Sequence, residues 1–361
     1  FYATLMSTLV LGSGLALAQI SVTSVLTNGL AEPYNIVADS DNNFFISDSI
    51  NNRIVRVDAN TGEVSTLAGL AGELPGSEDG PPYLARFNNP QGLVLVTLGG
   101  VEGLLVSDTG NHTVRFVNLT DASVSTVAGV AGQPGNAAGG PGVSRLRYPI
   151  GLATDGGGFV YVADMGNHTI RVLDLTSSNL TTLAVAGTTF NQPTAVALGN
   201  PGDLWVADTR NHMVKLIALT APESGSLQSV IGSGVAGSQA SAYGPNAQLN
   251  GPRGLLWWPA RSQLLISDTA NHAILLATNY PVYGPTNWSV RTFAGTPPVS
   301  GSADGSALQA QFNNPVGLAL DAEVNGFLIA DLKNNAIRRL QDGPQLPAVS
   351  APQIGWVDFV W

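Results

Sequence analysis

The stretch YVADMGNHTIRVL, residues 161–173, decides the fold, because variants of it occur six times along the chain. Every copy has an Asp, an Asn three residues later and a β-branched residue six residues after the Asp. An internal repeat of this kind indicates an array of similar supersecondary units. The other five copies are FISDSINNRIVRV (45–57), LVSDTGNHTVRFV (105–117), WVADTRNHMVKLI (205–217), LISDTANHAILLA (265–277) and LIADLKNNAIRRL (328–340).

Each copy predicts two β-strands joined by a short polar turn, since hydrophobic alternation precedes the Asp and resumes after the Asn. An apolar strand containing Pro comes before each copy, as in NPQGLVLVT and NPVGLALD. A Ser/Thr-rich strand ending near Gly follows five of them, as in SVSTVAG and SVRTFAG. Four strands per unit is the composition of a propeller blade. The sequence therefore predicts an all-β, six-bladed β-propeller of four-stranded antiparallel blades.

The sixth unit lacks its fourth strand, since Arg339-Leu340 runs directly into DGPQLP. The segment ISVTSVLTNG, residues 20–29, has the fourth-strand pattern but precedes the first blade. We expect this N-terminal strand to complete the last blade, because closing the ring hides two exposed sheet edges. The predicted organisation is an apolar segment at 1–18, the propeller at 19–343 and an apolar tail at 344–361.

The repeat resembles that of the NHL-repeat β-propellers, through the blocks DTGNHTV, DMGNHTI, DTRNHMV and DTANHAI and the PxGL and STLAG flanks. The resemblance covers about residues 19–343 and implies the six-bladed fold. Family members include RNA-binding domains, protein-interaction modules, extracellular sensor domains and a peptide-amidating lyase. Function must therefore be argued from the sites of this chain.

The repeated polar residues are expected to stabilise the turns. An Asp at a strand end can accept hydrogen bonds from turn amides two or three residues on, and Asn tolerates a left-handed backbone. Recurrence in every blade favours this role over general acid–base catalysis or calcium binding. The predicted structural residues are Asp48, Asp108, Asp164, Asp208, Asp268 and Asp331, with Asn51, Asn111, Asn167, Asn211, Asn271 and Asn334.

The sequence predicts no catalytic residue, metal site or cofactor. The four histidines share one repeat position at the start of a third strand, about 10 Å outside the innermost one, so they cannot converge on one ion. The resemblance implies a His-ligated zinc for the amidating lyase, and no other His is present. Sugar-lactonase-like propellers resemble this architecture and need acidic and amide ligands at the mouth of the central channel, and none of the residues expected there is acidic. The residues that follow the Pro of each innermost strand are Tyr34, Gln91, Ile150, Thr194, Arg253 and Val316.

Composition limits the partners. The chain has 361 residues, a net charge of −10 and no cysteine. An acidic surface repels phosphate backbones, so we expect no nucleic-acid partner.

Residues 1–18 are uncharged and end in Ala16-Leu17-Ala18, as at a signal-peptidase site. A membrane anchor or an ordered arm on a neighbouring subunit are the alternatives. Either way we expect a secreted or cell-surface protein.

Three sequons fall near hairpins between third and fourth strands and are candidate N-glycosylation sites if the chain is secreted by a eukaryote: Asn118, Asn179 and Asn287. Aromatic residues that break the repeat, and the apolar tail, are candidate contacts with protein partners or other copies of the chain. These residues are Trp257, Trp258, Tyr283, Trp288, Trp356, Phe359 and Trp361. The long connections between blades, expected on one face of the disc, are a further candidate binding surface.

The function hypothesis is a non-catalytic extracellular propeller that serves as a structural or assembly subunit, with a filament as one such assembly. It would act through its apolar ends and its long-loop face. One alternative is a recognition domain for protein or glycan on a cell-surface protein. The other is a lyase or lactonase-like enzyme with its site in the central channel.

Overall fold

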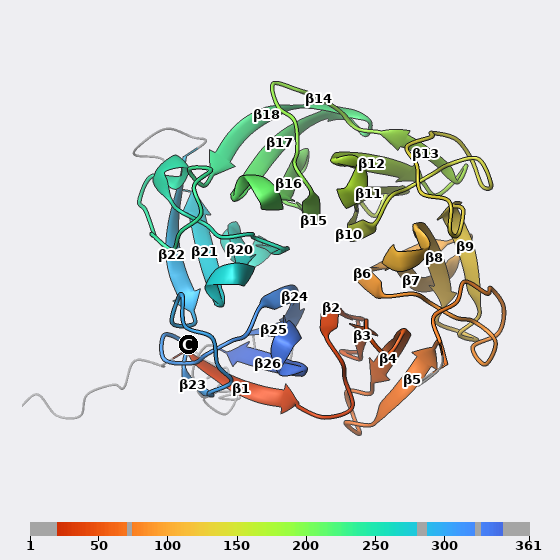
Figure 1. The fold of residues 1–361 in the computed structure, drawn as a ribbon, viewed down its shortest axis with the longest axis horizontal. Helices are drawn as coiled ribbons and strands as arrows, with labels where there is room; N and C mark the ends of the chain where they lie inside the picture. The colour runs from red at the N-terminus through yellow and green to blue at the C-terminus, as the bar shows by residue number, and fades with distance from the viewer. Residues whose placement is uncertain (1–19, 71–73, 280–286, 322–325, 342–361) are drawn as a thin grey trace, which may run out of the picture.

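The computed structural model describes residues 20–70, 74–279, 287–321 and 326–341. These residues form six sheets arranged around a central axis (Figure 1). The predicted six-bladed, all-β propeller is confirmed. Within the described part of the chain, no helix is long and apolar enough to cross a bilayer. The segments 1–18 and 344–361, for which a signal or anchor and an apolar tail are predicted, lie outside the described residues.

The four main strands of each blade are antiparallel, and in blades 1 to 5 they follow chain order from the axis outward. The innermost strands are β2 (Pro33–Ala38), β6 (Pro90–Leu98), β10 (Pro149–Thr154), β15 (Pro193–Leu198), β19 (Gly254–Trp258) and β24 (Pro315–Asp321). The second strands are β3 (Phe44–Asp48), β7 (Val101–Asp108), β11 (Phe159–Asp164), β16 (Asp203–Asp208), β20 (Gln263–Asp268) and β25 (Gly326–Asp331). The third strands are β4 (Arg53–Val57), β8 (Thr113–Asn118), β12 (Thr169–Asp174), β17 (Met213–Ala221), β21 (Ala273–Asn279) and β26 (Ala336–Gln341). The fourth strands of blades 1 to 5 are β5 (Val64–Ala68), β9 (Val124–Gly129), β13 (Asn179–Thr182), β18 (Ser224–Ile231) and β22 (Trp288–Ala294).

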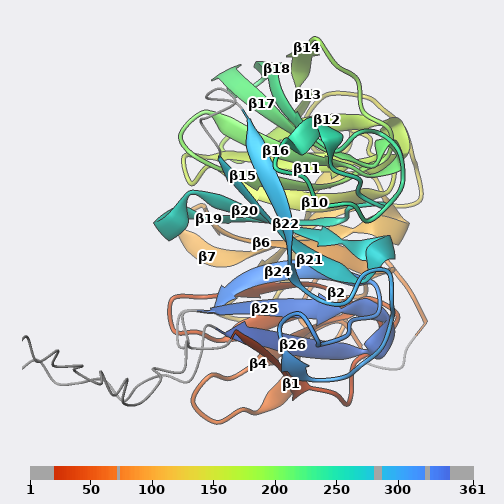
Figure 2. The same ribbon diagram turned by 90° about the vertical axis from the view of Figure 1, so that its left-hand side faces the viewer.

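The N-terminal strand closes the ring, as predicted. Strand β1 (Ser21–Leu26) pairs antiparallel with β26 and becomes the fourth strand of blade 6. Figure 2 shows β24, β25, β26 and β1 lying in succession in this blade. Two short strands extend other edges, since β23 (Gly305–Ser306) pairs with β1 and β14 (Ala184–Ala186) pairs with β18.

The hydrophobic core has seven clusters. Six lie one at each interface between neighbouring blades, and a small seventh cluster joins Tyr34, Ile150, Val316 and Leu332 near the axis. At the interface that closes the ring, Ile36 and Phe44 of blade 1 pack with Leu328 and Ala330 of blade 6. Because each blade shares its apolar side chains with both neighbours, removing one blade would expose two interfaces to water.

The glycine of the PxGL motif allows the innermost strands to approach each other. A Cβ at Gly92 would lie 1.8 Å from the carbonyl oxygen of Ile150 in the next blade. A Cβ at Gly254 would lie equally close, 1.8 Å, to the carbonyl oxygen of Val316. A side chain at either position would force these two blades apart.

Three tryptophans predicted as partner contacts lie inside the propeller, so that part of the prediction is wrong. Trp257 and Trp258 end β19 instead of forming the expected turn, and both are buried. The rings of Trp257 and Trp288 pack against Trp205 of blade 4, at centroid distances of 6.5 and 4.8 Å. The ring of Trp258 meets Phe327 of blade 6 at 4.7 Å. These indoles fill the two interfaces of blade 5. The local turn pattern in the sequence does not show how large the side chains at these interfaces must be.

The other aromatic residues predicted as partner contacts lie outside the described residues. They are Tyr283, Trp356, Phe359 and Trp361. Their role as contacts stays a prediction.

Ring closure predicts different effects for two valines of β1. Val22 is fully buried in the cluster between blades 5 and 6, whereas Val25 is 41% exposed. Val22→Ala should lower the free energy of unfolding by roughly 2 kcal/mol, from lost apolar burial and the cavity left behind. Val25→Ala, the matched control in the same strand, should change it by less than about 0.5 kcal/mol. Urea unfolding measures both, and equal losses would contradict the assigned role of β1.

Candidate functional site

The repeated residues lie at one end of each blade, where the second strand turns into the third. In blade 2 the turn is a 3₁₀ segment, η1 (Thr109–Asn111), that follows Asp108. The residue after the shared Asn has a left-handed backbone in all six blades, with φ between 53° and 61°. All six repeat Asp side chains are almost fully buried. A buried carboxylate must be matched by hydrogen-bond donors, so its partners define what the turn does.

Each repeat Asp binds the start of the innermost strand of its own blade. One carboxylate oxygen accepts the backbone N–H of the residue two positions before the proline that precedes or begins this strand, at 2.6–2.7 Å. The other oxygen accepts the side-chain amide of the repeat Asn at 2.6–2.9 Å. The expected bonds from turn amides to the Asp are not those observed. The reason is that backbone carbonyls already satisfy the turn amides, as when His112 donates to Thr109.

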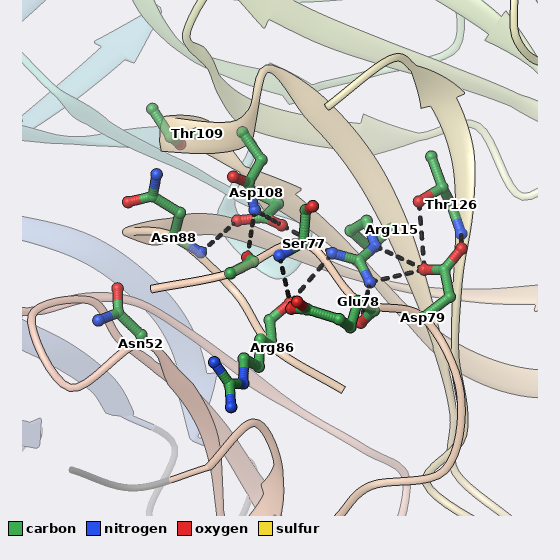
Figure 3. Close-up of polar contacts among 12 residues, drawn as sticks. Asn52, Ser77, Glu78, Asp79, Arg86, Asn88, Asp108, Thr109, Arg115 and Thr126 are labelled. Atoms are coloured by element: carbon green, nitrogen blue, oxygen red, sulfur yellow. Dashed lines mark hydrogen bonds and ion pairs between the residues drawn. The ribbon is translucent and has the colours of Figure 1, made fainter. Parts of the chain in front are cut away.

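A buried cation on the third strand completes this network in blade 2 (Figure 3). Arg115 is paired with Asp108 at 2.8 Å and with Asp79 of the preceding connection at 2.6 Å. Asp79 also accepts the backbone N–H of Thr126 in the fourth strand, at 3.0 Å. One guanidinium thus joins the repeat turn, the connection and the outer strand.

Blade 6 has the same arrangement, and there it joins strands from the C-terminal part of the chain to the N-terminal strand β1. Arg338 pairs with Asp331 at 3.0 Å and with Asp304 at 2.6 Å. Asp304 accepts the backbone N–H of Ser24 at 3.0 Å and its hydroxyl at 3.1 Å. The closing strand is therefore held by the same carboxylate device that holds the fourth strand of blade 2.

Sequence reasoning missed these cations, although a signal was present. A basic residue stands seven positions after the repeat Asp in four of the six copies. In blades 3 and 4 these are Arg171, 3.2 Å from Asp164, and Lys215, 2.5 Å from Asp208.

Blade 5 has Leu275 at this position, so Asp268 is buried without that cation. The donors to its carboxylate are the backbone N–H of Asn250 and the side chain of Asn271. Burial raises the pKa of Asp268 to about 6, against the lowering effect of these two hydrogen bonds.

The repeat Asn has a second role wherever a long connection precedes the blade. Its amide also donates to a glycine carbonyl of that connection at 2.5–2.7 Å. The four pairs are Asn111 with Gly76, Asn167 with Gly135, Asn271 with Gly237 and Asn334 with Gly301. The repeat turn therefore fixes the connection to the blade.

The long connections do not stay on one face as expected. They begin beside the repeat turns and then run along the outer strand of the next blade, where Gly80 bridges to Val124 and Ser241 to Val290. Exposed strand edges are sites of unwanted pairing, and these bridges cover part of the edge.

The histidines link neighbouring blades. The Nδ1 atoms of His112, His168, His212 and His272 each accept a backbone N–H from the start of the next blade, at 3.0–3.2 Å. Asn52 and Asn335 make the same link with their side-chain oxygens at 2.8 Å. Burial lowers the pKa of His112 and His272, which favours the neutral imidazole that can accept this bond. All four histidines of the chain thus lie in the repeat turns.

A cavity of about 310 Å³ lies along the axis, between the innermost strands. Its walls are mainly aliphatic, and Tyr34, Thr194 and Arg253 are among its polar residues. A second cavity of about 210 Å³ lies beside the repeat turns and shares Ile150, Thr194 and Arg253 with the first. Among the residues that the structure describes, no group of three or more His, Asp and Glu is placed to hold a metal ion.

The candidate glycosylation sites differ in access. Asn179 is exposed at the start of β13. Asn118 is partly buried, and its side-chain oxygen accepts the N–H of Thr120 at 2.8 Å. Asn287 is buried, which contradicts its prediction as a glycan site because the amide has to be accessible for modification.

Comparison with known proteins identifies the repeat. The NHL repeat model matches residues 146–173 and 190–215, which contain the Asp–Asn turns of blades 3 and 4. These two segments are NHL repeats, and the chain is similar to NHL repeat-containing proteins. This NHL-repeat chain is 28% identical over 331 residues to human NHL repeat-containing protein 2, covering 81% of the chain and 44% of that protein. It spans less than half the length of that curated relative.

Solved structures with the same fold carry varied names. An auxiliary nutrient binding protein of Bacteroides thetaiotaomicron matches with a TM-score of 0.67 and 16% identity, over 90% of this chain and 76% of the other. A streptogramin B lyase matches with a TM-score of 0.57 and 13% identity, over 91% of this chain and 99% of the other. Identities this low establish a shared fold and not a shared activity.

Asp268, which lacks the cation of blade 4, predicts a pH effect on stability that adds to that of Asp108, whose pKa burial also raises to about 6 despite Arg115. Because the folded pKa of Asp268, about 6, lies above the ordinary value near 4, its favourable contribution is present below about pH 4 and is lost as the pH rises to about 6. Leu275→Lys supplies the cation that blade 4 has, and should lower the pKa of Asp268 by about 1–3 units. The fall in unfolding free energy between pH 4 and 6 should then shrink.

Urea unfolding across this pH range and NMR titration of the carboxyl group measure both effects. Leu320→Lys, at a position 39% exposed, is the control for added charge. Identical pH profiles for the two variants would contradict the assignment.

Proposed function

We propose that this NHL-repeat propeller is a non-catalytic protein-binding module whose binding surface is formed by the four long connections. The observation that supports it is the distribution of exposed apolar side chains. Of the thirteen large hydrophobic side chains exposed among the described residues, nine lie on these connections. This connection surface consists of Leu74, Tyr83, Leu84, Val143, Tyr148, Val235, Tyr243, Val299 and Leu308.

The anchoring of the connections supports the same role. Each is tied to its blade by a repeat Asn, and two of them also by the Arg115–Asp79 and Arg338–Asp304 ion pairs. Buried anchors such as Phe87 and Phe312 lie under the connections, and these two rings face Arg115 and Arg338. A surface that is ordered before binding loses less conformational entropy when a partner docks. Leu84, by contrast, is 54% exposed and available for contact.

The proposal of a non-catalytic role rests on how the reactive groups are used. The repeat Asp residues and the histidines, which are the candidates for acid–base or metal chemistry, are committed to hydrogen bonds within and between blades. A channel-centred lyase or lactonase-like enzyme is the weaker alternative. The lyase among the structural neighbours supports it through the fold alone.

A pair of matched double variants tests the connection surface. Tyr83→Ser with Leu84→Ser removes exposed apolar side chains from a connection, whereas Val25→Ser with Val64→Ser removes them from outer strands. Partners that co-purify with the tagged native chain should be lost at least tenfold from the first variant and retained by the second. Thermal unfolding checks that both variants fold. Equal recovery from the two variants would reject the connection surface.

Assembly through the apolar ends of a secreted chain is a second proposal, supported by the sequence of the tail, which contains Trp356, Phe359 and Trp361. If the tail contacts neighbouring copies, deleting residues 344–361 should reduce the mass of the particle measured in solution by light scattering. An unchanged mass for an oligomeric protein would argue against the tail as the contact.

If the chain passes through a eukaryotic secretory pathway, Asn179 is the candidate N-glycosylation site with the most accessible side-chain amide.

A further inference from the structure

The entrance of the axial channel holds a cation that has no acidic partner. Arg253 follows Pro252 at the start of blade 5 and is exposed, and it lines both the axial cavity and the cavity beside the repeat turns. Its guanidinium makes no ion pair with any carboxylate of the described residues. In a chain where Arg115, Arg171 and Arg338 are all buried in ion pairs, this arginine is not needed to hold the blades together.

A buried hydroxyl without a hydrogen-bond acceptor lies beside it. Tyr34, at the same position in blade 1, is 6% exposed, and its hydroxyl donates no hydrogen bond within the described chain. Burial raises the pKa of this phenol, and the Arg253 guanidinium lowers it through its charge and as a hydrogen-bond donor. Because a guanidinium can only donate, the hydroxyl proton of Tyr34 still has no acceptor. A buried donor without an acceptor is costly and therefore calls for an explanation, such as a ligand that accepts its proton.

The electrostatics of the entrance favour an anion. Arg210 is the other charged residue of the cavity beside the repeat turns, and no Asp or Glu lines either cavity. This positive entrance occurs in a chain with a net charge of −10. A recess with one sign of charge and walls of low polarity concentrates the field and attracts ligands of the opposite sign.

Beyond Arg253 the channel becomes apolar. Its wall is built from mainly aliphatic residues of all six innermost strands, among them Val37, Val94, Leu152, Leu256 and Leu318, with Asn35 and Thr154 as polar members. The cavity of about 310 Å³ is at the lower end of the size range of small-molecule sites. No charged residue other than Arg253 lines this cavity, so a multiply charged ligand would lack counter-charges inside it.

We propose that the axial channel binds a small monocarboxylate with an apolar body. The carboxylate accepts hydrogen bonds from the Arg253 guanidinium and the Tyr34 hydroxyl, and the apolar body enters the channel between the innermost strands. An arginine can bind a carboxylate through two parallel hydrogen bonds, which fixes the orientation of the head group. The aliphatic wall contributes affinity in proportion to the apolar surface that it removes from water.

Calorimetric titration with octanoate tests the site, with octanol and acetate as probes that lack the charge or the apolar body. Octanoate should bind with the highest affinity, at least tenfold above either comparison probe. Arg253→Gln should weaken octanoate binding about tenfold or more, because it removes a charged hydrogen-bond donor. Tyr34→Phe should weaken it threefold or more. Arg86→Gln, which removes the same charge from a long connection, should leave it unchanged.

Absence of octanoate binding, or equal binding by the native chain and Arg253→Gln, would overturn the proposal. Octanol binding as tightly as octanoate would reject the role of the carboxylate, and acetate binding as tightly would reject the role of the channel wall. Arg253 is exposed, so its substitution should not disturb folding, and the test does not depend on Tyr34→Phe. The double variant Tyr83→Ser with Leu84→Ser should bind octanoate normally, so failure of this site and failure of the connection surface can be told apart.

Discussion

A buried carboxylate at the end of the second strand of each blade is the interaction on which the rest of the propeller depends. It binds the backbone at the start of the innermost strand and the side chain of the repeat Asn. Because a carboxylate out of water requires several donors, the surrounding turn has little freedom in sequence or conformation. The Asn in turn fixes the long connections, and the next residue, usually His, reaches the neighbouring blade. One buried charge thus organises contacts within a blade, outside it and between blades.

The ring form follows from how the apolar surface is distributed. Six of the seven core clusters lie between blades, so a single blade could not bury its own hydrophobic side chains. The innermost strands approach so closely that glycine is required at Gly92 and Gly254. Closure by β1 completes both the last sheet and the last interface, and Asp304 ties that strand to the same network of carboxylate and arginine that recurs in blade 2.

The hydrogen-bond network distinguishes side chains that hold the blades together from side chains that can still contact a ligand or a partner. The side chains that a reader of the sequence would first consider reactive, the repeat Asp residues and the histidines, are used as internal hydrogen-bond partners. The repeat leaves two kinds of position free to vary. One is the residue after the proline at the start of each innermost strand, and the other is the exposed part of each long connection. Those positions hold Arg253 and Tyr34 at the channel entrance and the apolar side chains of the connection surface. Both proposed binding surfaces therefore lie where the blades differ from one another.

The sequence by itself determined the number of blades, the order of strands and the closing role of residues 20–29, because a period-two pattern and a recurring turn are local signals. It also indicated that the repeat polar residues belong to turns. Only the tertiary structure decided what those residues bind, since the partners of Asp108 lie on another strand and on a connection. It likewise placed Trp257 and Asn287 in the interior, and brought Tyr34 of blade 1 near Arg253 of blade 5. These outcomes depend on how blades meet around an axis, and contacts between residues so distant in the chain leave no periodic trace in the sequence.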